Sequence, residues 1–153
     1  MTFAPLSFRC WLRVSAFSAL GLALGLFLFP EFLSLFLLFN LTPSLPRGLY
    51  RVTRLEVRQG ALVTFCLPPP LVGRFGLARW IAPGRCPGGK APLCKRIAVV
   101  GPGRAACGKT VWQVAQGEVF VRGDSLHSQD SCVFGPVPVA WLRDGVVPVW
   151  THP

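Results

Sequence analysis

The sequence predicts a mainly β fold, in which one N-terminal transmembrane helix is followed by a small β domain. Two observations support this prediction. From Val14 to Phe29 the chain has no charged residue, as is typical of a membrane span. After Phe39, short runs rich in β-branched and aromatic residues alternate with Gly and Pro clusters, as is typical of short strands and turns. About 110 residues follow the apolar run, enough for one small domain with a modest core.

The membrane helix is expected at residues 14–33. A helix needs about 20 residues to span the hydrocarbon layer, and extending the run to Leu33 gives that length while Glu31 stays near the interface. A cleaved secretory signal is the alternative, but the run exceeds the usual apolar core of such signals and no clear cleavage site follows it. Arginines lie on both sides of the span, so positive charge does not fix its orientation. We therefore divide the chain into a short N-terminal segment (1–13), an anchor (14–33) and a folded domain (34–153).

The elements of the folded domain are expected in the following order. The apolar run Phe32–Phe39 is either a buried strand or a surface that lies on the bilayer. A short helix is expected around Val72–Ile81, and the Pro- and Gly-rich stretch Pro83–Pro92 is expected to be a loop. The predicted strands are Leu62–Phe65, Lys95–Val100, Val111–Val114 and Glu118–Val121.

Ser44 is the candidate nucleophile of the chain. It lies between Pro43 and Pro46, and prolines on both sides exclude regular helix and ladder pairing, so its hydroxyl is expected in a fixed turn. A serine needs a base to act as a nucleophile. The two histidines are poor candidates, since His152 lies in the C-terminal tail and His127 is expected in a loop.

Lys95 is the better candidate for the base. Period-two alternation along its predicted strand places it on the same apolar face as Ile97 and Val99. Burial there disfavours the ammonium, and a fall in the lysine pKa from about 10.4 to about 7.5 corresponds to roughly 4 kcal/mol of differential stabilisation. Lysine tolerates such a change, whereas arginine does not.

Three sequence blocks, which follow one another in the family's order, resemble the membrane-bound signal peptidase I family of Ser-Lys peptidases. The match is closest to its conjugative-transfer branch, the TraF-type pilin-processing peptidases. Asn40–Tyr50 is similar to the nucleophile box, Lys95–Ile97 to the lysine box, and Gly123–Val137 to the last box of the family. With the anchor ahead of them, the blocks cover most of the chain, and their order is more specific than any one of them.

The resemblance implies a role for each matching residue. Ser44 is the nucleophile and Lys95 its general base. Thr42 contributes its hydroxyl to the oxyanion hole together with the backbone N–H of Ser44, and Ser128 orients the lysine. Three charged residues hold the site together through charged hydrogen bonds: Arg96, Asp124 and Asp130.

Two positions depart from the family pattern. Leu45 replaces a common methionine, which preserves volume. Cys132 stands where the pattern usually has arginine, so Asp130 loses a charged partner. Arg122 is the candidate replacement for that partner.

The resemblance also implies a function. It implies a membrane-anchored serine endopeptidase whose catalytic domain (34–153) lies on the periplasmic side of the bacterial inner membrane. The enzyme would cleave a conjugative pilin precursor through an acyl-enzyme, with or without cyclisation, and without a metal or cofactor. The implied partners are the precursor, inner-membrane lipid and components of a conjugative type IV secretion system. Two alternatives remain open: a general type I signal peptidase acting on exported proteins, and a non-catalytic membrane scaffold of a secretion or conjugation assembly.

A nucleotide-binding alternative rests on Gly103–Thr110, which fits the phosphate-binding pattern G-x4-G-K-T after a predicted strand. Such a loop opens a helix, but the following run, Val111–Val121, is β-branched and contains Gly117. About 43 residues remain after this motif, too few for a parallel sheet with crossover helices. We therefore expect a hairpin here, with Lys109 as a solvated turn residue.

The cysteines are expected to form disulfides rather than a metal site. Five of the six follow the anchor, so at least one stays free if all bridges are internal. Cys86 and Cys94 flank the Pro/Gly loop and are the expected pair, which an extracytoplasmic location permits. Their spacing matches no common zinc pattern, and histidines are scarce.

The net charge of +10 does not predict a nucleic-acid partner. The arginines are spread along the chain and no recognition motif accompanies them. Attraction to anionic lipid and a solvated basic surface are the two interpretations that remain.

Overall fold

The computed structural model describes one continuous stretch, residues 36–152, and four isolated positions before it. Those four are helical: Ser18, Gly21, Leu22 and Gly25. The predicted N-terminal segment (1–13) lies outside the described residues, and so does the predicted anchor (14–33) apart from these four positions. Among the described residues, no helix combines the length and the apolar character needed to cross a bilayer. The chain divides into two compact units, 1–36 and 37–153, and nearly all of the described residues belong to the second.

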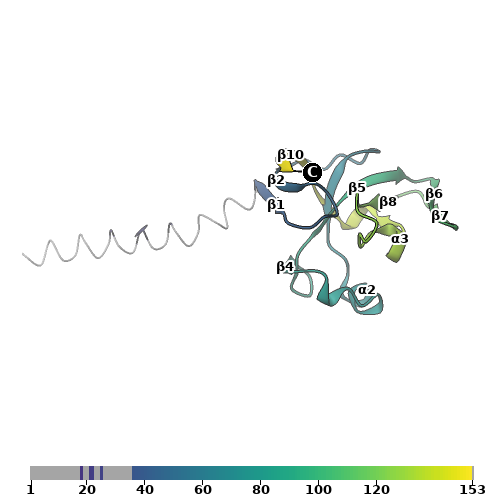
Figure 1. Cartoon of the computed structure of the whole chain (residues 1–153), viewed down its shortest axis with the longest axis horizontal. Coiled ribbons are helices and arrows are strands. Elements are labelled where there is room, and N and C mark those ends of the chain that lie inside the picture. Colours follow the sequence, from purple (N-terminus) through teal and green to yellow (C-terminus); the bar gives the residue numbers. More distant parts are fainter. Residues whose placement is uncertain (1–17, 19–20, 23–24, 26–35, 153) are drawn as a thin grey trace, which may run out of the picture. The chain divides into compact units, whose positions relative to one another are not determined.

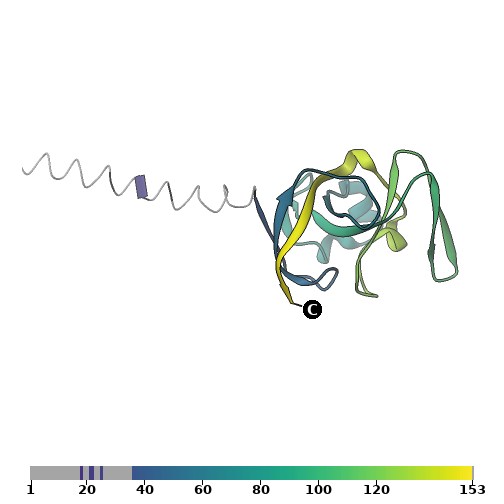
Figure 2. The same cartoon turned by 90° about the horizontal axis from the view of Figure 1, so that it is seen from above.

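The second unit is built on a curled, antiparallel seven-stranded sheet with the strand order β1-β2-β10-β3-β5-β8-β9. A separate two-stranded sheet, β6-β7, projects from it as a hairpin (Figures 1 and 2). The mainly β prediction is therefore confirmed. The strands are β1 (Leu37–Asn40), β2 (Arg47–Thr53), β3 (Leu62–Phe65), β4 (Pro83–Cys86), β5 (Leu93–Val100), β6 (Gly103–Cys107), β7 (Thr110–Val114), β8 (Glu118–Arg122), β9 (Val137–Pro138) and β10 (Leu142–His152).

The helices are few and short. They are α2 (Pro69–Arg74), η1 (Leu77–Arg79), α3 (Ser131–Phe134) and η2 (Val139–Trp141). The helix predicted around Val72–Ile81 is present as two pieces, α2 and η1, because Gly76 between them takes a left-handed conformation with φ of 63°. Both pieces bury one side against the sheet, through Val72 of α2 and Leu77 of η1.

The stretch Pro83–Pro92, predicted as a loop, is more ordered than expected. It contains the short strand β4, and both Pro83 and Cys86 form isolated bridges with Lys90. Gly84 packs so closely on Ala91 that an added Cβ would overlap its backbone. The prediction was wrong at this point because Pro and Gly content indicates turns but does not exclude a tight local hairpin. We refer to residues 68–92 as the side segment.

The G-x4-G-K-T motif is a hairpin, as predicted. Its first residues form β6, the chain turns at Gly108 and Lys109, and Thr110 begins β7. Lys109 is exposed, and a strand follows in place of the helix that a phosphate-binding loop requires. This arrangement rules out the nucleotide-binding interpretation of the motif.

The disulfides differ from the expected pair. Cys86 is bonded to Cys66, not to Cys94, and a second disulfide joins Cys107 to Cys132. Cys94 is free, because it lies within β5 and pairs there with Thr64 of β3, away from Cys86. One disulfide thus fastens the side segment to the end of β3, and the other fastens the β6–β7 hairpin to α3.

The main core lies between the sheet and the side segment, where Phe65, Ile97 and Val121 are fully buried. A second, smaller cluster lies under the hairpin and contains Val114 and Phe120. The predicted shared face of the lysine strand holds for Lys95 and Ile97 only. A bulge between Ile97 and Val99 shifts the alternation, and Val99 packs against the second cluster.

Candidate active site

The site residues predicted from the sequence meet along one groove of about 870 Å³. Its walls come from β1, the following loop, the start of β5, the side segment, the loop before α3, and α3 itself. Four of the predicted residues line it: Thr42, Ser44, Lys95 and Ser128. Apolar side chains form much of the remaining surface.

The Ser44 loop, residues 41–46, is held by the side chain of Asn40, which is buried at the end of β1. Its Nδ2 group donates to the carbonyls of Thr42, Leu45 and Pro46 at 3.0, 2.9 and 3.2 Å. Its Oδ1 atom accepts from the backbone N–H and the hydroxyl of Thr42 at 3.2 and 2.9 Å. One amide therefore satisfies five groups of a loop that the prolines exclude from sheet pairing.

Ser44 is held by its own backbone and side-chain contacts. Its Oγ lies 2.8 Å from the Oγ1 of Thr42, and its carbonyl accepts a 2.7 Å hydrogen bond from the N–H of Asp124. Because the Thr42 hydroxyl donates to Asn40, the proton shared between the two hydroxyls comes from Ser44. Leu45 is the buried anchor of the loop.

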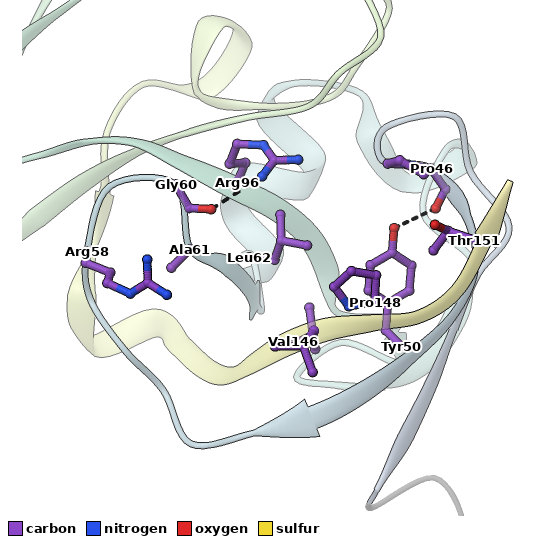
Figure 3. Close-up of a pocket in the computed structure, with 11 residues that line it drawn as sticks. Pro46, Tyr50, Arg58, Gly60, Ala61, Leu62, Arg96, Val146, Pro148 and Thr151 are labelled. Atoms are coloured by element: carbon purple, nitrogen blue, oxygen red, sulfur yellow. Dashed lines mark hydrogen bonds between the residues drawn. The ribbon is translucent and has the colours of Figure 1, made fainter. Parts of the chain in front are cut away.

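A second cavity, of about 280 Å³, lies behind the Ser44 loop (Figure 3). Tyr50 borders it and donates a 2.6 Å hydrogen bond to the carbonyl of Pro46. Burial, followed by the charge of Cys94, raises the pKa of Tyr50, so the phenol stays protonated and remains a donor. The contact supports the loop from the side away from the groove.

Lys95 is almost completely buried on β5, with 2 % of its surface exposed. Its Nζ donates a 2.9 Å hydrogen bond to the Oγ of Ser128. Burial lowers its pKa to about 8, while the negative charge of Asp130 opposes that shift. The side chain is therefore an amine that loses its proton near pH 8, at the wall of the groove that also holds Ser44.

Curated proteins that resemble this chain have one name in common. A conjugal transfer protein TraF of Agrobacterium tumefaciens (strain 15955) is 32 % identical over 74 % of this chain and 82 % of its own length. This chain belongs to the TraF family of conjugal transfer proteins. A probable conjugal transfer protein TraF of Sinorhizobium fredii is 31 % identical over 67 % of this chain and 71 % of its own. A plasmid transfer protein TraF of Escherichia coli is 44 % identical over 38 % of this chain and 33 % of its own.

Two further comparisons returned nothing. The chain matches no family model and no solved structure. The predicted resemblance to TraF proteins of conjugal transfer is therefore confirmed. The assignments to signal peptidase I and to pilin-processing peptidases stay predictions.

In this TraF-family chain, the loop that carries Ser128 depends on Asp130. The carboxylate of Asp130 accepts from the N–H of Gly123 and the N–H of Cys132, both at 2.9 Å, and so closes the loop and begins α3. Arg122 lies 3.5 Å from the same carboxylate. Arg122 is thus a charged neighbour of Asp130, as predicted, and Cys132 joins the disulfide to Cys107.

Arg96 and Asp124, two of the predicted charged residues, pair at 3.6 Å. Both side chains are more than 40 % exposed, so the pair contributes little stability by itself. The ion pair lies between two parts of the site. The backbone N–H of Asp124 donates to the Ser44 carbonyl, and Arg96 borders the cavity behind the Ser44 loop (Figure 3). The pair thus connects the Ser128 loop with β5 next to Lys95.

Gly123 allows the two loops to approach each other. A Cβ added there would overlap the Oγ of Ser128, would lie 2.6 Å from the Cβ of Ser128, and would lie 3.0 Å from the carbonyl oxygen of Ser44. No other residue type fits this position without displacing Ser128 or the Ser44 loop.

Asn40, Tyr50 and Gly123 support the site but were not predicted from the sequence. A signal existed for Asn40, since an asparagine two residues before a threonine and near prolines is typical of a side-chain-closed turn. The contacts of Tyr50 and Gly123 follow from how distant parts of the chain pack, and the sequence carries no local signal for them.

Proposed function

We propose that this chain is a serine endopeptidase of the Ser-Lys type that processes a pilin precursor in conjugative transfer. One observation carries the proposal: the hydroxyl of Ser44 and the buried amine of Lys95 line the same groove. A lysine with a pKa of about 8 is neutral often enough to accept a proton, whereas an ordinary lysine is not.

The proposed reaction has two steps, formation of an acyl-enzyme and its hydrolysis. The Oγ of Ser44 attacks the scissile carbonyl while the neutral Nζ of Lys95 takes the hydroxyl proton. The tetrahedral intermediate collapses, the C–N bond breaks, and the resulting ammonium of Lys95 returns the proton to the leaving amine. Water then attacks the acyl-enzyme with Lys95 again as base, which releases the acid and restores Ser44. If the amino terminus of the substrate attacks in place of water, the product is a cyclic polypeptide.

The oxyanion would be bound by the N–H of Ser44 and the hydroxyl of Thr42. Thr42 supports this role by position, because its Oγ1 lies 2.8 Å from the attacking oxygen. In the free groove this hydroxyl donates to Asn40, so its proton must turn towards the substrate when the negative charge develops. Each such donor contributes about 3 to 4 kcal/mol to transition-state stabilisation.

The names of the relatives support the choice of substrate. They are conjugal and plasmid transfer proteins, so a component of the conjugation apparatus is the preferred substrate over a general exported protein. The two disulfides support an oxidising compartment. We place the groove on the periplasmic side of the inner membrane, with the predicted anchor (14–33) in the lipid and the secretion apparatus as its neighbour.

The test is co-expression of the full-length chain with the pilin precursor encoded nearby, followed by intact-mass analysis of the product. Wild type is expected to remove a terminal segment; loss of one further water marks cyclisation, and its absence marks hydrolysis. Ser44→Ala and Lys95→Met are expected to leave the precursor unchanged. His127→Ala is the matched control, since His127 also lines the groove and histidine is the other residue type there that could act as the base.

Three results would overturn the proposal. Processing by Ser44→Ala or Lys95→Met would exclude the dyad, and loss of processing in His127→Ala alone would move the base to His127. If wild type leaves the precursor unchanged and its Ser44 also fails to react with a small acylating ester, the scaffold alternative replaces the peptidase.

A further inference from the structure

Trp80 is a large apolar side chain that is exposed to solvent and also lines the groove. Its exposed fraction is 67 %, and it shares the groove with Ser44 and Lys95. Tryptophan is the residue type that most often dominates binding energy at protein surfaces, because its indole offers a large, rigid apolar contact. The peptidase mechanism proposed above leaves Trp80 without a role.

The backbone around Trp80 is fixed. Its N–H donates to the carbonyl of Leu77 at 2.9 Å, and the N–H of Ile81 donates to the same carbonyl at 3.2 Å. Leu77 and Ile81 are both buried in the main core. The indole therefore projects from a short turn that is anchored on both sides.

Lys90 strengthens this turn from the other end of the side segment. Its Nζ donates to the carbonyl of Ala78 at 2.5 Å and to that of Ile81 at 3.4 Å. The disulfide between Cys66 and Cys86 fastens the side segment to the end of β3. A side chain presented on so constrained a backbone loses little entropy on binding, which favours affinity.

The groove that Trp80 lines is mainly apolar and carries little charge. Lys95 is the one lysine, arginine, aspartate or glutamate among the described lining residues. Leu126, in the loop that carries Ser128, is 98 % exposed and also lines the groove. Trp80 and Leu126 thus border the same groove from separate segments, together with the exposed side chains of Phe39 and Leu41.

Resting on the proposed peptidase function, we infer that Trp80 is a specificity-determining residue that binds a bulky apolar side chain of the substrate, with Leu126 as a second contact. The substrate class is a polypeptide whose stretch around the cleavage site is uncharged and carries at least one such side chain. Among the described residues, no hydrogen bond joins Trp80 to Ser44 or Lys95. We therefore assign Trp80 to substrate binding and not to the chemical step.

The test compares Trp80→Ala with Trp150→Ala in the full-length protein. Trp150 is the matched control, since it is 61 % exposed but lies on β10 outside the groove lining. The substrates are a peptide that spans the cleavage site of the pilin precursor and a set of variants in which each bulky apolar residue is replaced by alanine. Trp80→Ala is expected to raise KM by about tenfold with kcat within twofold, Trp80→Phe to have a smaller effect, and Trp150→Ala to match wild type.

A second expected result identifies the contact. One alanine substitution in the peptide should weaken cleavage by wild type but have no further effect on Trp80→Ala, because the partner of the lost side chain is already missing. The inference is overturned if Trp80→Ala has the KM of Trp150→Ala, if it lowers kcat alone, or if wild type and Trp80→Ala respond equally to every peptide variant.

A small acylating ester separates failure of this inference from failure of the function. Wild type and Trp80→Ala are expected to be acylated at Ser44 at the same rate, since the ester is too small to need Trp80. Equal acylation together with equal peptide cleavage overturns the role of Trp80 and leaves the peptidase standing. A wild type that neither reacts with the ester nor cleaves the peptide overturns both.

Discussion

The Nζ of Lys95 donates a 2.9 Å hydrogen bond to the Oγ of Ser128, which joins β5 to a loop 33 residues further along the chain. A buried lysine has several rotamers to lose and must be fixed by a partner to face one direction. Ser128 supplies that partner, and its own position depends on Gly123 and Asp130. The direction of the amine is therefore set by the loop before α3 as much as by the strand that carries it.

The rate of cleavage should follow the protonation state of Lys95. The proposed chemistry requires the neutral amine, and burial lowers the pKa of Lys95 to about 8. We therefore expect kcat/KM to rise with pH, with a midpoint near 8, and to level off above it. The measurement is a pH profile on a peptide substrate. A profile with a midpoint near the ordinary lysine pKa, or one that falls through pH 8, would contradict the role of Lys95.

Ser128→Ala should lower activity without unfolding the domain. The change removes the acceptor of the hydrogen bond that Nζ donates, worth about 1 to 3 kcal/mol when a partner is buried, so kcat is expected to fall by about 10- to 100-fold. Ser125→Ala is the control: Ser125 lies in the same loop and lines the same groove, but its Oγ accepts from the N–H of His127. Equal loss of activity in the two variants would show that the loss comes from a less stable loop and not from a changed orientation of Lys95.

Gly123→Ala should damage the site more than its size suggests. The added methyl group overlaps the Oγ of Ser128 and crowds the Ser44 carbonyl, so we expect at least a tenfold loss of kcat. Gly73→Ala is the control, because a Cβ at Gly73 meets nothing within 4 Å in α2, where alanine is favoured over glycine by about 0.5 to 1 kcal/mol. Thermal unfolding and steady-state kinetics of both variants test this, and an active Gly123→Ala enzyme would contradict the described packing.

Arg122→Gln should move the pH profile upward. Burial lowers the pKa of Lys95 and the charge of Asp130 raises it; Arg122, 3.5 Å from Asp130, offsets part of that negative charge. Without Arg122 the ammonium of Lys95 is favoured, so its pKa rises and the midpoint of kcat/KM moves to higher pH. Arg104→Gln removes an exposed charge from β6 and should leave the midpoint in place. A shift to lower pH in Arg122→Gln would reverse the assigned electrostatics.

The irregular Ser44 loop and the burial of Lys95 were predictable because each follows from a local pattern. The prolines around Ser44 indicated an irregular loop, and a lysine in an apolar, alternating run indicated burial. Both features are properties of a few neighbouring residues, and the structure places Ser44 at an irregular turn and Lys95 at 2 % exposure. The hairpin interpretation of the G-x4-G-K-T motif rested on the same kind of local evidence, namely the β-branched residues after it.

The connections across the domain were not predictable in the same way. Pairing of Cys66 with Cys86 depends on where the side segment returns to the sheet, and sequence spacing favoured Cys94 instead. The bulge after Ile97 adds one residue to a strand whose composition gives no sign of it. The insertion of β10 between β2 and β3 is also a property of the whole chain. The pairing of strands far apart in sequence depends on the total surface that the pairing buries.

The unpaired thiol of Cys94 makes occupancy of the groove measurable in the unmodified protein. Cys94 lines the groove beside Lys95, is the one cysteine outside a disulfide among the described residues, and has a pKa that burial raises to about 12. Thiolate is therefore scarce at neutral pH, so alkylation of the free thiol is slow. A peptide bound in the groove covers Cys94 and is expected to slow alkylation further. The rate of Cys94 alkylation, followed by peptide mass so that Cys10 is counted separately, thus reports whether the groove is occupied.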